Sequence, residues 1–443
     1  MRRALWAISV AAAVGRSPAA HANPVDAFGF GARAQALGSA YSAVADDSAA
    51  NYYNPAGLAR ARGLKIDIGY QISRPLMEVS GQRQPLLDSR GLTAGVVLPG
   101  SIAGVRFAFG VALLLPDQHV TRIRVLSFDQ PRLHMYDNRT QRLYLAANLA
   151  VHIYRGLYLG GGLAFMSRSS GTVYLRGRVG ISDPERSELS SSISQDLLAI
   201  RYPQVGLLFE VTPRLALALT YRHRFALDLE QGFQIDAQVG DPGQRPVVEK
   251  GQLKELARSV DLFQPWQLVV AAAARFSRLQ VSVDLTYARW SEQPPPAAVF
   301  TLDLDIGQLT DLVRLPKSKE YPPVGFRDLL IPAIGLEWRA IEHAGPLSLD
   351  ARAGYRYEAS PVPEQDGDES LGDSDKHLFS VGVGAELAGL TRVLPRPISI
   401  DGFLGLGYLP TRTFRKADPR SAVGDFTVAG YVLQAGLQTR FTF

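Results

Sequence analysis

GFGARAQALGSAYSAVADDSAANYYNPAGLA, residues 29–59, is the stretch that decides the fold, because everything after it reads as repeated short strands and this segment does not. It is rich in small residues, has helical character and is interrupted at Asp46-Asp47. It ends in Asn54-Pro55-Ala56, where Asn suits a helix cap and Pro the first helical position, so the motif predicts a turn into a short helix. We predict that this segment is a plug inside a barrel formed by the rest of the chain.

The first residues predict export. Met1-Arg2-Arg3 is a positively charged start, residues 4–14 are an apolar run, and Ala20-His21-Ala22 is a cleavage site of the small-x-small type. We therefore expect a signal peptide over residues 1–22 and a mature chain that begins near Asn23. Ordinary secretion is favoured over twin-arginine export, because the rest of that longer signal is missing.

The composition narrows the class of protein. After the signal, no uninterrupted apolar run reaches the roughly 20 residues that a membrane helix needs, so the product is either soluble and periplasmic or spans a membrane with strands. The chain has 0 Cys, which excludes a disulfide framework and a thiolate metal site. Its 47 Lys and Arg residues nearly balance 42 Asp and Glu and are scattered, unlike the clustered basic face of a nucleic-acid-binding protein.

From Leu64 to the end, segments of about ten residues alternate apolar and polar residues with a period of two, the pattern of a strand with two different faces. In the first of them, Ile66, Ile68 and Tyr70 share one face. Asp67 and Gln71 lie on the other. A soluble β-sandwich also has alternating strands, so the alternation alone leaves both architectures open.

The connections separate the two architectures. The fourteen candidate strands begin near Leu64, Gly91, Gly104, Gln141, Gly156, Arg201, Arg214, Pro265, Arg278, Asp328, Pro346, His377, Pro397 and Thr427. Tight turns, as at Arg155-Gly156, alternate with long loops such as 116–139, 169–200, 227–263 and 291–327. Short turns on one side, long loops on the other and an even strand number are typical of bacterial outer-membrane barrels, with both termini in the periplasm. The sheet must close, because an open edge leaves backbone groups unpaired in lipid.

The last strand and the aromatic residues support this interpretation. Tyr431, Leu433 and Phe441 share one face of the final segment, which ends on Phe443. Aromatic residues near strand ends fit the girdles at the two membrane interfaces. These candidates are Trp266, Trp290, Trp338, Tyr355 and Tyr408.

The residues resemble the FadL-type family of outer-membrane transporters for long-chain fatty acids and other hydrophobic compounds. The stretch that ends in Asn54-Pro55-Ala56 resembles the N-terminal hatch of that family and its NPA motif. The strand that ends in Trp290-Ser291 and the pattern 354–357 (Gly-Tyr-Arg-Tyr) followed by Ser360-Pro361-Val362 are also similar. Gly372-Asp373 stands where a Pro-Asp pair is usual, and the loops between about 116 and 263 match nothing in the family pattern.

The resemblance implies an all-β fold: a membrane-spanning antiparallel barrel of about fourteen strands over residues 63–443, with a helical plug over residues 23–62 in its lumen. It further implies capture of a hydrophobic small molecule by extracellular loops, passage to a pocket near the plug, and lateral release through the barrel wall. The expected surroundings are outer-membrane lipid and lipopolysaccharide of a Gram-negative bacterium. We expect a monomer, no cofactor, no bound metal and no nucleic-acid partner.

Candidate site residues fall into three groups. The gate consists of Asn54, Pro55 and Ala56 with Asp46 and Asp47. Candidate ligand contacts are lumen-facing arginines and an apolar loop patch at helical spacing, and they are Arg222, Arg224, Arg352, Arg356, Leu256, Val260 and Phe263. Two bland alternatives stand beside them: such arginines often pair with acids such as Asp284, Asp350, Asp46 and Asp47, and apolar loop residues often pack on one another.

A local break in the wall is expected at Gly104, Gly110 and Pro116, because Gly marks bulges and Pro removes a donor from the ladder. The chain has no GxSxG elbow, HExxH motif or Walker loop, so we expect no enzyme. Two rival functions are a scaffold or assembly subunit of an envelope complex built on the same barrel, and a general porin.

Overall fold

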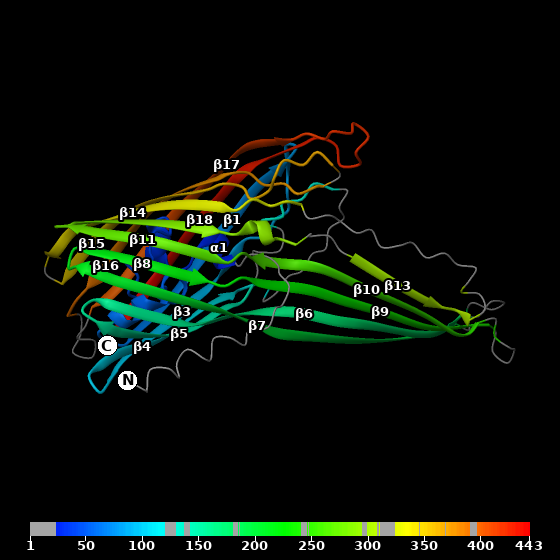
Figure 1. Ribbon diagram of the computed structural model, residues 1–443, viewed down its shortest axis with the longest axis horizontal. Coiled ribbons are helices and arrows are strands. Elements are labelled where there is room, and N and C mark those ends of the chain that lie inside the picture. Colours follow the sequence, from blue (N-terminus) through cyan, green and yellow to red (C-terminus); the bar gives the residue numbers. More distant parts are fainter. Residues whose placement is uncertain are drawn as a thin grey trace, which may run out of the picture.

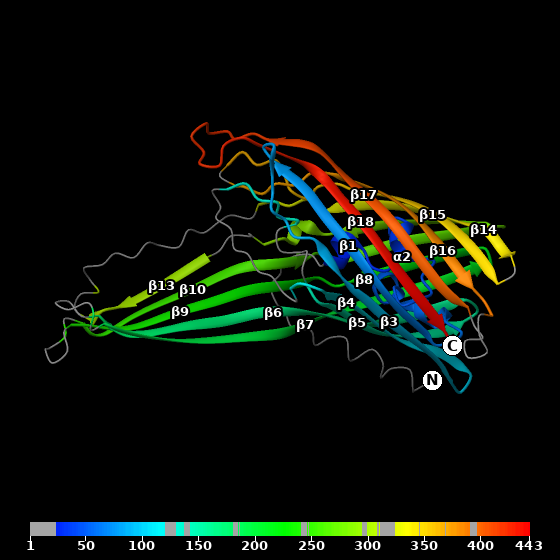
Figure 2. The ribbon, with the colours of Figure 1, turned by 180° about the vertical axis from the view of Figure 1, so that it is seen from behind.

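The first and last strands close the sheet. Strand β1 (Lys65–Val79) pairs antiparallel with β18 (Phe426–Thr442) from Lys65 opposite Thr442 to Val79 opposite Val428. Figure 2 shows the two strands side by side, with β17 (Ile398–Phe414) beyond β18. The closed ladder leaves no open edge at the ends of the wall, as a barrel in lipid requires.

The computed structural model describes residues 24–119, 130–136, 142–179, 185, 187–240, 246, 248–294, 299–307, 310, 324–344, 346–367, 369–389 and 397–443. The expected signal peptide lies outside these residues. Fourteen of the described strands form the barrel wall, as the sequence predicted. Besides β1, β17 and β18 they are β3 (Ser89–Ile102), β4 (Val105–Pro116), β5 (Tyr144–Tyr154), β6 (Leu157–Val179), β7 (Glu188–Thr212), β8 (Leu215–Arg222), β11 (Gln267–Phe276), β12 (Leu279–Ala288), β14 (Leu329–Ala344), β15 (Leu347–Glu358) and β16 (Lys376–Leu387).

The two faces of the wall follow the alternation in the sequence. On β1, Ile68 and Tyr70 are exposed on the outside, whereas Asp67 and Gln71 are buried against the lumen. An apolar exterior is what contact with lipid requires, and a polar interior is usual for such barrels. Among the described residues, no helix has the length and apolar character to cross a membrane.

Short turns gather at the end of the barrel where the chain ends (Figure 1). The turn Ala103-Gly104 between β3 and β4 has φ of 51° and 79°, the left-handed pair that a two-residue hairpin turn uses. Arg155-Gly156 between β5 and β6 has the same form. The expected break at Gly104 is therefore wrong: this residue lies in a turn. Gly110 and Pro116 lie within β4, which pairs with β3 without a register shift from Val105 to Pro116.

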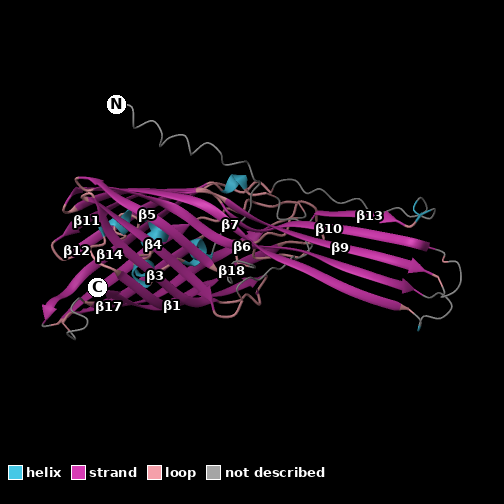
Figure 3. Ribbon diagram, turned by 90° about the horizontal axis from the view of Figure 1, so that it is seen from below, coloured by secondary structure: helices cyan, strands magenta, loops and turns pink. Residues whose placement is uncertain are grey.

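The plug fills the lumen (Figures 1 and 3). It consists of α1 (Pro24–Phe28), α2 (Ala32–Ala36), α3 (Ala50–Tyr53) and the 3-10 helix η1 (Pro55–Arg60). Small residues let it lie against the wall: a Cβ on Gly354 of β15 would come within 2.0 Å of the Gly38 nitrogen. Gly38 itself has φ of +62°. The segment is a plug because its small residues permit this close approach from all sides.

Beyond the barrel, five strand segments of the same sheet form an extension, which we call the outer sheet and which projects beyond the wall (Figure 1). Its strands, in spatial order, are the outer parts of β7 and β6, then β9 (Phe225–Val239), β10 (Val248–Gln264) and β13 (Val299–Asp305). The regions 169–200, 227–263 and 291–327, expected as loops, therefore contain strands. The helical spacing around Leu256 and Val260 was misleading, because both residues lie on β10.

Two smaller elements complete the described fold, namely β2 (Gln82–Arg83) and the 3-10 helix η3 (Trp290–Glu292). Trp338 and Tyr408 are exposed on the barrel exterior, as the girdle positions require. Trp290 is not a girdle residue. It is buried and stacks on Phe326, with ring centroids 6.3 Å apart.

Candidate functional site

Buried ion pairs fix the plug to the wall. Arg33 of α2 donates through Nε and Nη2 to the two carboxylate oxygens of Glu337 on β14, each at 2.8 Å. Asp47 accepts from Arg440 of β18 and, at 2.9 Å, from the hydroxyl of Tyr41. Charge-assisted bonds of this kind are stronger than neutral ones. Charged contacts therefore hold the plug to β14 and to β18.

Asp46 has a different environment, since 36% of its side chain is exposed. Burial works to raise its pKa, but the charges of Lys65, Arg33 and Arg60 outweigh burial and hold the pKa well below its usual range. Its carboxylate lies 3.0 Å from Arg33 Nη1. The two adjacent acids that interrupt the plug are thus both used to fix it, Asp46 within the plug and Asp47 to the wall.

The Asn54-Pro55-Ala56 motif performs the capping that its sequence predicts. Asn54 Oδ1 accepts from the Ala56 nitrogen at 3.1 Å, with Pro55 at the first position of η1. Asn54 Nδ2 also donates to the carbonyl oxygens of Ser42 and of Leu207 on β7, each at 3.0 Å. The side chain of Asn54 therefore ties together the start of η1, the middle of the plug and the wall.

Glycines of the wall make room for this motif. A Cβ on Gly160 of β6 would lie 2.4 Å from the Ala56 nitrogen, and one on Gly206 of β7 would lie 2.0 Å from Asn54 Oδ1. Such distances are too short for any real side chain. The plug therefore approaches the wall at β6 and β7 more closely than a residue with a Cβ would allow.

Consecutive residues of the plug line two different cavities. The outer cavity has a volume of about 60 Å³ and includes Ser42 in its lining. The inner cavity, of about 230 Å³, includes Ala43 and Val44 with Arg60 and Glu210. Consecutive residues of one segment thus separate the two spaces. The Ser42 nitrogen donates to Asp284 Oδ2 of β12 at 3.0 Å, which together with Asn54 holds this partition in place.

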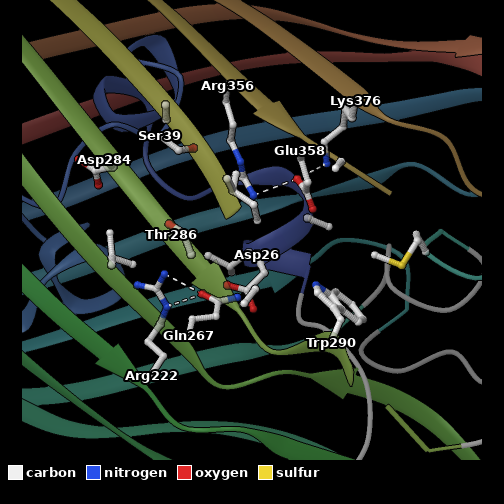
Figure 4. Close-up of a pocket in the computed structure, with 18 of the residues that line it drawn as sticks. Asp26, Ser39, Arg222, Gln267, Asp284, Thr286, Trp290, Arg356, Glu358 and Lys376 are labelled. Atoms are coloured by element: carbon white, nitrogen blue, oxygen red, sulfur yellow. Dashed lines mark hydrogen bonds and ion pairs between the residues drawn. The ribbon is translucent and has the colours of Figure 1, made fainter. Parts of the chain in front are cut away.

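The outer cavity combines apolar and charged lining residues (Figure 4). Its apolar part comes from the plug, the wall and loop residues, among them Val25, Tyr52, Met135, Tyr136, Val269, Trp290 and Ile331. Its charged part consists of Asp26, Arg222, Asp284, Arg356, Glu358, Asp373 and Lys376. A buried water molecule needs roughly 10–15 Å³ of cavity volume, so a cavity of about 60 Å³ holds about four to six water molecules. A long acyl chain therefore requires neighbouring side chains to move.

The four predicted arginines divide into two classes. Arg222 and Arg356 line the outer cavity. Arg222 donates to Gln267 Oε1 at 3.0 and 2.8 Å and lies over the ring of Tyr52, 4.6 Å from its centroid. Arg356 donates to Glu358 at 3.0 Å, and Lys376 lies 2.9 Å from the same oxygen. Both arginines thus point a guanidinium at the cavity.

The other two arginines are occupied away from the cavity lining. Arg224 pairs with Glu292 at 2.8 Å. Arg352 lies 2.6 Å from both Glu337 and Asp401 and 3.4 Å from Asp350, so it belongs to the ion-pair network that holds Arg33. Arg352 therefore pairs with acids of the lumen, which was the alternative to ligand binding for these arginines.

Of the predicted apolar patch, Leu256 and Phe263 are not among the described residues that line the outer cavity. Phe263 is fully buried beside Trp290, with ring centroids 5.3 Å apart. Leu256 lies far along the outer sheet, opposite Gly232 of β9. Val260 is opposite Asp228 in the same pairing. Leu133, Met135 and Tyr136, which precede β5, are buried in one apolar cluster with Phe263, and Met135 and Tyr136 also reach the cavity.

The sequence did not predict a ligand-binding role for two acids that line the cavity, Asp26 and Asp284. Asp26 accepts from the Tyr52 hydroxyl through Oδ1, but its buried Oδ2 has no hydrogen-bond partner among the described residues. Burial raises the pKa of Asp26, and the nearby charge of Arg222 only partly opposes this. Asp284 Oδ1 is likewise buried without a described partner. The cavity therefore presents hydrogen-bonding oxygens as well as guanidinium groups.

The described residues contain no group of His, Asp and Glu placed to bind a metal ion. The plug occupies the lumen, and a small pocket lies beside it. Its chemistry is that of binding: an apolar wall with two guanidinium groups and buried carboxylate oxygens.

Comparisons with known proteins agree with this architecture. Residues 10–392 match the model of a family described as outer membrane protein transport protein (OMPP1/FadL/TodX). A search of curated proteins gives no match. The crystal structure of a Pseudomonas aeruginosa FadL homologue is similar, with a TM-score of 0.57 and 14% identity over 96% of this chain and 99% of that one.

Two further solved structures share the fold. The Pseudomonas putida toluene transporter TodX has a TM-score of 0.54 and 15% identity over 94% of this chain and 99% of its own. The Ralstonia pickettii toluene transporter TbuX has a TM-score of 0.51 and 19% identity, again over 94% and 99%. The chain belongs to the OMPP1/FadL/TodX family of outer membrane transport proteins, which are channels of the Gram-negative outer membrane and not enzymes.

Proposed function

We propose that this protein carries hydrophobic small molecules, long-chain fatty acids or aromatic and aliphatic hydrocarbons, passively across the outer membrane. The observation that carries the proposal is the pocket between the plug and Trp290, in a lumen that the plug closes. A closed lumen gives ions no open path. A pocket with an apolar wall and a few placed polar groups is the usual form of a small-molecule site.

The proposed route has three stages. The ligand is captured at the outer end of the barrel, where the apolar cluster of Phe263, Trp290 and Tyr136 lies. It then enters the outer cavity next to the plug. It leaves sideways through the wall, because an apolar molecule gains free energy on entering the bilayer core and gains none in the aqueous periplasm.

Arg222 and Arg356 are the proposed contacts for a ligand that bears a carboxylate, since guanidinium groups bind carboxylates through charge-assisted bonds. A hydrocarbon lacks that group and would use the apolar wall alone. In the same proposal, residues 23–62 are the plug and residues 63–443 the barrel, in contact with lipid and, at the outer end, lipopolysaccharide. The described elements support these boundaries, because η1 ends at Arg60 and β1 begins at Lys65.

Uptake by cells tests the proposal. Isogenic cells with and without the protein are given a radiolabelled long-chain fatty acid and, separately, a labelled alkylbenzene, and initial uptake rates are compared. Protein-dependent uptake of either compound supports the proposal. Equal rates for every apolar compound, together with a stoichiometric partner protein on purification, would instead favour a scaffold. A steady ion current in planar bilayers would favour a porin.

A further inference from the structure

The outer sheet has two chemically different faces. Where strands pair, partners share a face, so Val173 of β6 lies on the side of Ile193 on β7 and Phe233 on β9. We call this side the outward face. Its described residues on β6, β7, β9, β10 and β13 are Gly171, Val173, Leu175, Gly177, Leu189, Ser191, Ile193, Gln195, Gln231, Phe233, Ile235, Ala237, Val239, Gly251, Leu253, Glu255, Ala257, Leu302 and Leu304.

The opposite side, here the polar face, carries most of the charge. Its described charged residues are Arg176, Arg178, Glu188, Asp196, Glu230, Asp236, Lys254, Arg258, Asp303 and Asp305. Contacts within it satisfy several of these groups. For example, Arg178 donates to Gln238 at 3.0 Å and Gln252 donates to Asp236 at 2.8 Å. Among the residues that the regular pairing places on the outward face, Glu255 is the charged one, so this part of the face is mostly apolar; Glu249 and Lys250 lie at the irregularity between Val248 and Gly251, where the pairing assigns no face.

The outward face is open to the surroundings. Leu189 is 75% exposed, Ile193 70% and Phe233 37%. These residues stand in a regular array on a sheet, which differs from single apolar residues scattered over a surface. Contiguous apolar surface of this kind marks an interaction site.

The outward face continues the lipid-facing side of the barrel. On β6, Leu159 and Leu163 are exposed on the barrel exterior, and Val173 and Leu175 follow on the same side. The pairing of β6 with β7 runs from Leu157 to Arg178 without a register shift, so the sides do not exchange. A strand crosses the bilayer in about 9–11 residues, which places the array beyond the hydrocarbon. Lipid tails therefore cover the lower part of this side and leave the upper part uncovered.

A second copy of the chain fits this surface better than a small ligand does. The face is one side of an open sheet, whereas ligand sites are concave. The cavity at the tip of the outer sheet is lined largely by polar-face residues, including Arg176, Arg178 and Asp236. With strands about 4.8 Å apart and a rise of about 3.3 Å per residue, five strands over about ten residues cover roughly 800 Å². Two such faces bury about 1,600 Å² together, the size of a stable protein interface.

Membrane insertion fixes how two copies meet. Both copies enter the membrane with the same end outward, so a twofold axis that relates them runs along the membrane normal. Rotation about that axis turns the outward face of one outer sheet toward the same face of the other. Within the bilayer, the exterior of β6 and β7 of one copy then faces the exterior of the same strands of the other copy.

We propose that the outer sheet is a dimerisation surface, on which the outward face packs against the outward face of a second copy. This replaces the monomer that the sequence led us to expect. The polar face remains toward the barrel mouth and solvent. Dimerisation does not depend on which molecule the protein transports.

Single cysteines test the contact in the membrane. The chain has 0 Cys, so each variant carries one thiol. Val173→Cys places it on the outward face, and Thr172→Cys, the matched control, places it on the polar face of the same strand. Outer membranes are treated with a flexible bismaleimide, and a monofunctional maleimide measures access to each thiol. We expect at least about ten times more cross-linked dimer from Val173→Cys. Comparable yields from the two variants, or a Val173→Cys variant whose thiol is accessible but forms no dimer, overturn the proposal.

Charge insertion tests the same face in purified full-length protein. Ile193→Lys with Phe233→Lys adds two charges to the outward face, and Ser192→Lys with Gln234→Lys adds two to the polar face. Because an unpaired buried charge is strongly unfavourable, the outward pair should weaken association by at least about 100-fold. Light scattering in detergent should give a dimer for the wild type and the polar-face pair, and a monomer for the outward pair.

Other results overturn the proposal in distinguishable ways. A monomeric wild type that also fails to cross-link in membranes excludes the dimer. If the wild type is monomeric and only the variant Ile193→Lys with Phe233→Lys loses uptake of hydrophobic compounds, the outward face is a capture surface for ligands and not a dimer interface. If neither the wild type nor any variant supports uptake of hydrophobic compounds, the proposed transport function is wrong. The light-scattering and cross-linking tests of the dimer are unaffected by that result.

Discussion

Arg33 and Glu337 meet through two parallel hydrogen bonds of 2.8 Å that join α2 of the plug to β14 of the wall. Their side chains are 14% and 13% exposed, so water screens the pair little. The geometry is bidentate, which fixes orientation as well as distance. The position of the plug therefore depends on a charged contact made by one turn of a very short helix.

Removal of one partner should loosen the plug. Arg33→Ala leaves Glu337 buried with Arg352 as its remaining close cation, and breaking a buried pair typically destabilises a protein by about 3–5 kcal/mol. We expect a lower melting temperature in detergent and a higher ion conductance in planar bilayers. Arg74→Ala is the control, since Arg74 pairs with Asp88 at the surface and is 51% exposed. Unchanged conductance in Arg33→Ala would show that this pair does not hold the closure.

Two substitutions of Asn54 separate its role as the cap of η1 from its role in holding the plug to the wall. Asn54→Asp keeps the oxygen that caps η1 but loses both bonds donated to Ser42 and Leu207, whereas Asn54→Ala loses all three. Loss of a cap typically costs about 1 kcal/mol. If the donated bonds hold the partition between the two cavities, both variants should leak ions, and Asn54→Ala should also be less stable. A tight Asn54→Asp channel would assign the motif to capping alone.

Asp373 gives the pocket a dependence on pH. Burial in the loop before β16 raises the pKa of Asp373 to about 6, although Ser360 donates to it at 2.7 Å. The fold then holds this proton more tightly than the unfolded chain does, with its ordinary pKa of 3.8. The resulting stabilisation is present below about pH 4 and is lost as the pH rises through about 6, with a change of up to roughly 3 kcal/mol.

Melting curves of the wild type and Asp373→Asn between about pH 4 and pH 7 check this. The amide cannot ionise, so the variant should lack the Asp373 contribution and should be at least as stable as the wild type at the upper end of this range. Parallel pH profiles for the two proteins would mean that Asp373 does not titrate in this range.

Arg222 should distinguish acids from hydrocarbons. A hydrogen bond to a charged group contributes about 1.5–3 kcal/mol, so Arg222→Gln should lower fatty-acid uptake by roughly 10- to 100-fold at subsaturating concentration. Uptake of an alkylbenzene should change little. Arg224→Gln is the matched control, because Arg224 lies two residues away and pairs with Glu292. Equal losses for both ligands in Arg222→Gln would indicate a structural role through Tyr52 and Gln267.

The alternation of residues such as Ile68 and Asp67 was sufficient to predict the wall, because lipid on one side and a polar lumen on the other impose opposite demands on neighbouring residues. The plug was predictable for a related reason. Its small residues cannot form an apolar strand face, and Asn54-Pro55 has a defined local geometry. Both features depend only on residues that are close together in the chain, so a single sequence is enough to recognise them.

The outer sheet and the ion-pair partners were not predictable in this way. On β10, Leu253 and Leu256 lie on opposite faces, and their spacing also fits a helix, so periodicity did not decide between the two. Arg352 finds Asp401, 49 residues further along the chain, only through the barrel register. Asp26 precedes the motif region, and its role in the pocket follows from burial beside Tyr52, which a sequence does not record.

The central claim is that a hydrophobic ligand occupies the pocket between the plug and Trp290. A crystal structure of the full-length protein with a bromine-labelled fatty acid, and one with a bromoalkylbenzene, test it directly through the anomalous signal of bromine. We predict a bromine peak among Tyr52, Val269 and Trp290 for at least one ligand. Peaks confined to the lipid-facing exterior, with an unchanged pocket in both crystals, would contradict the claim.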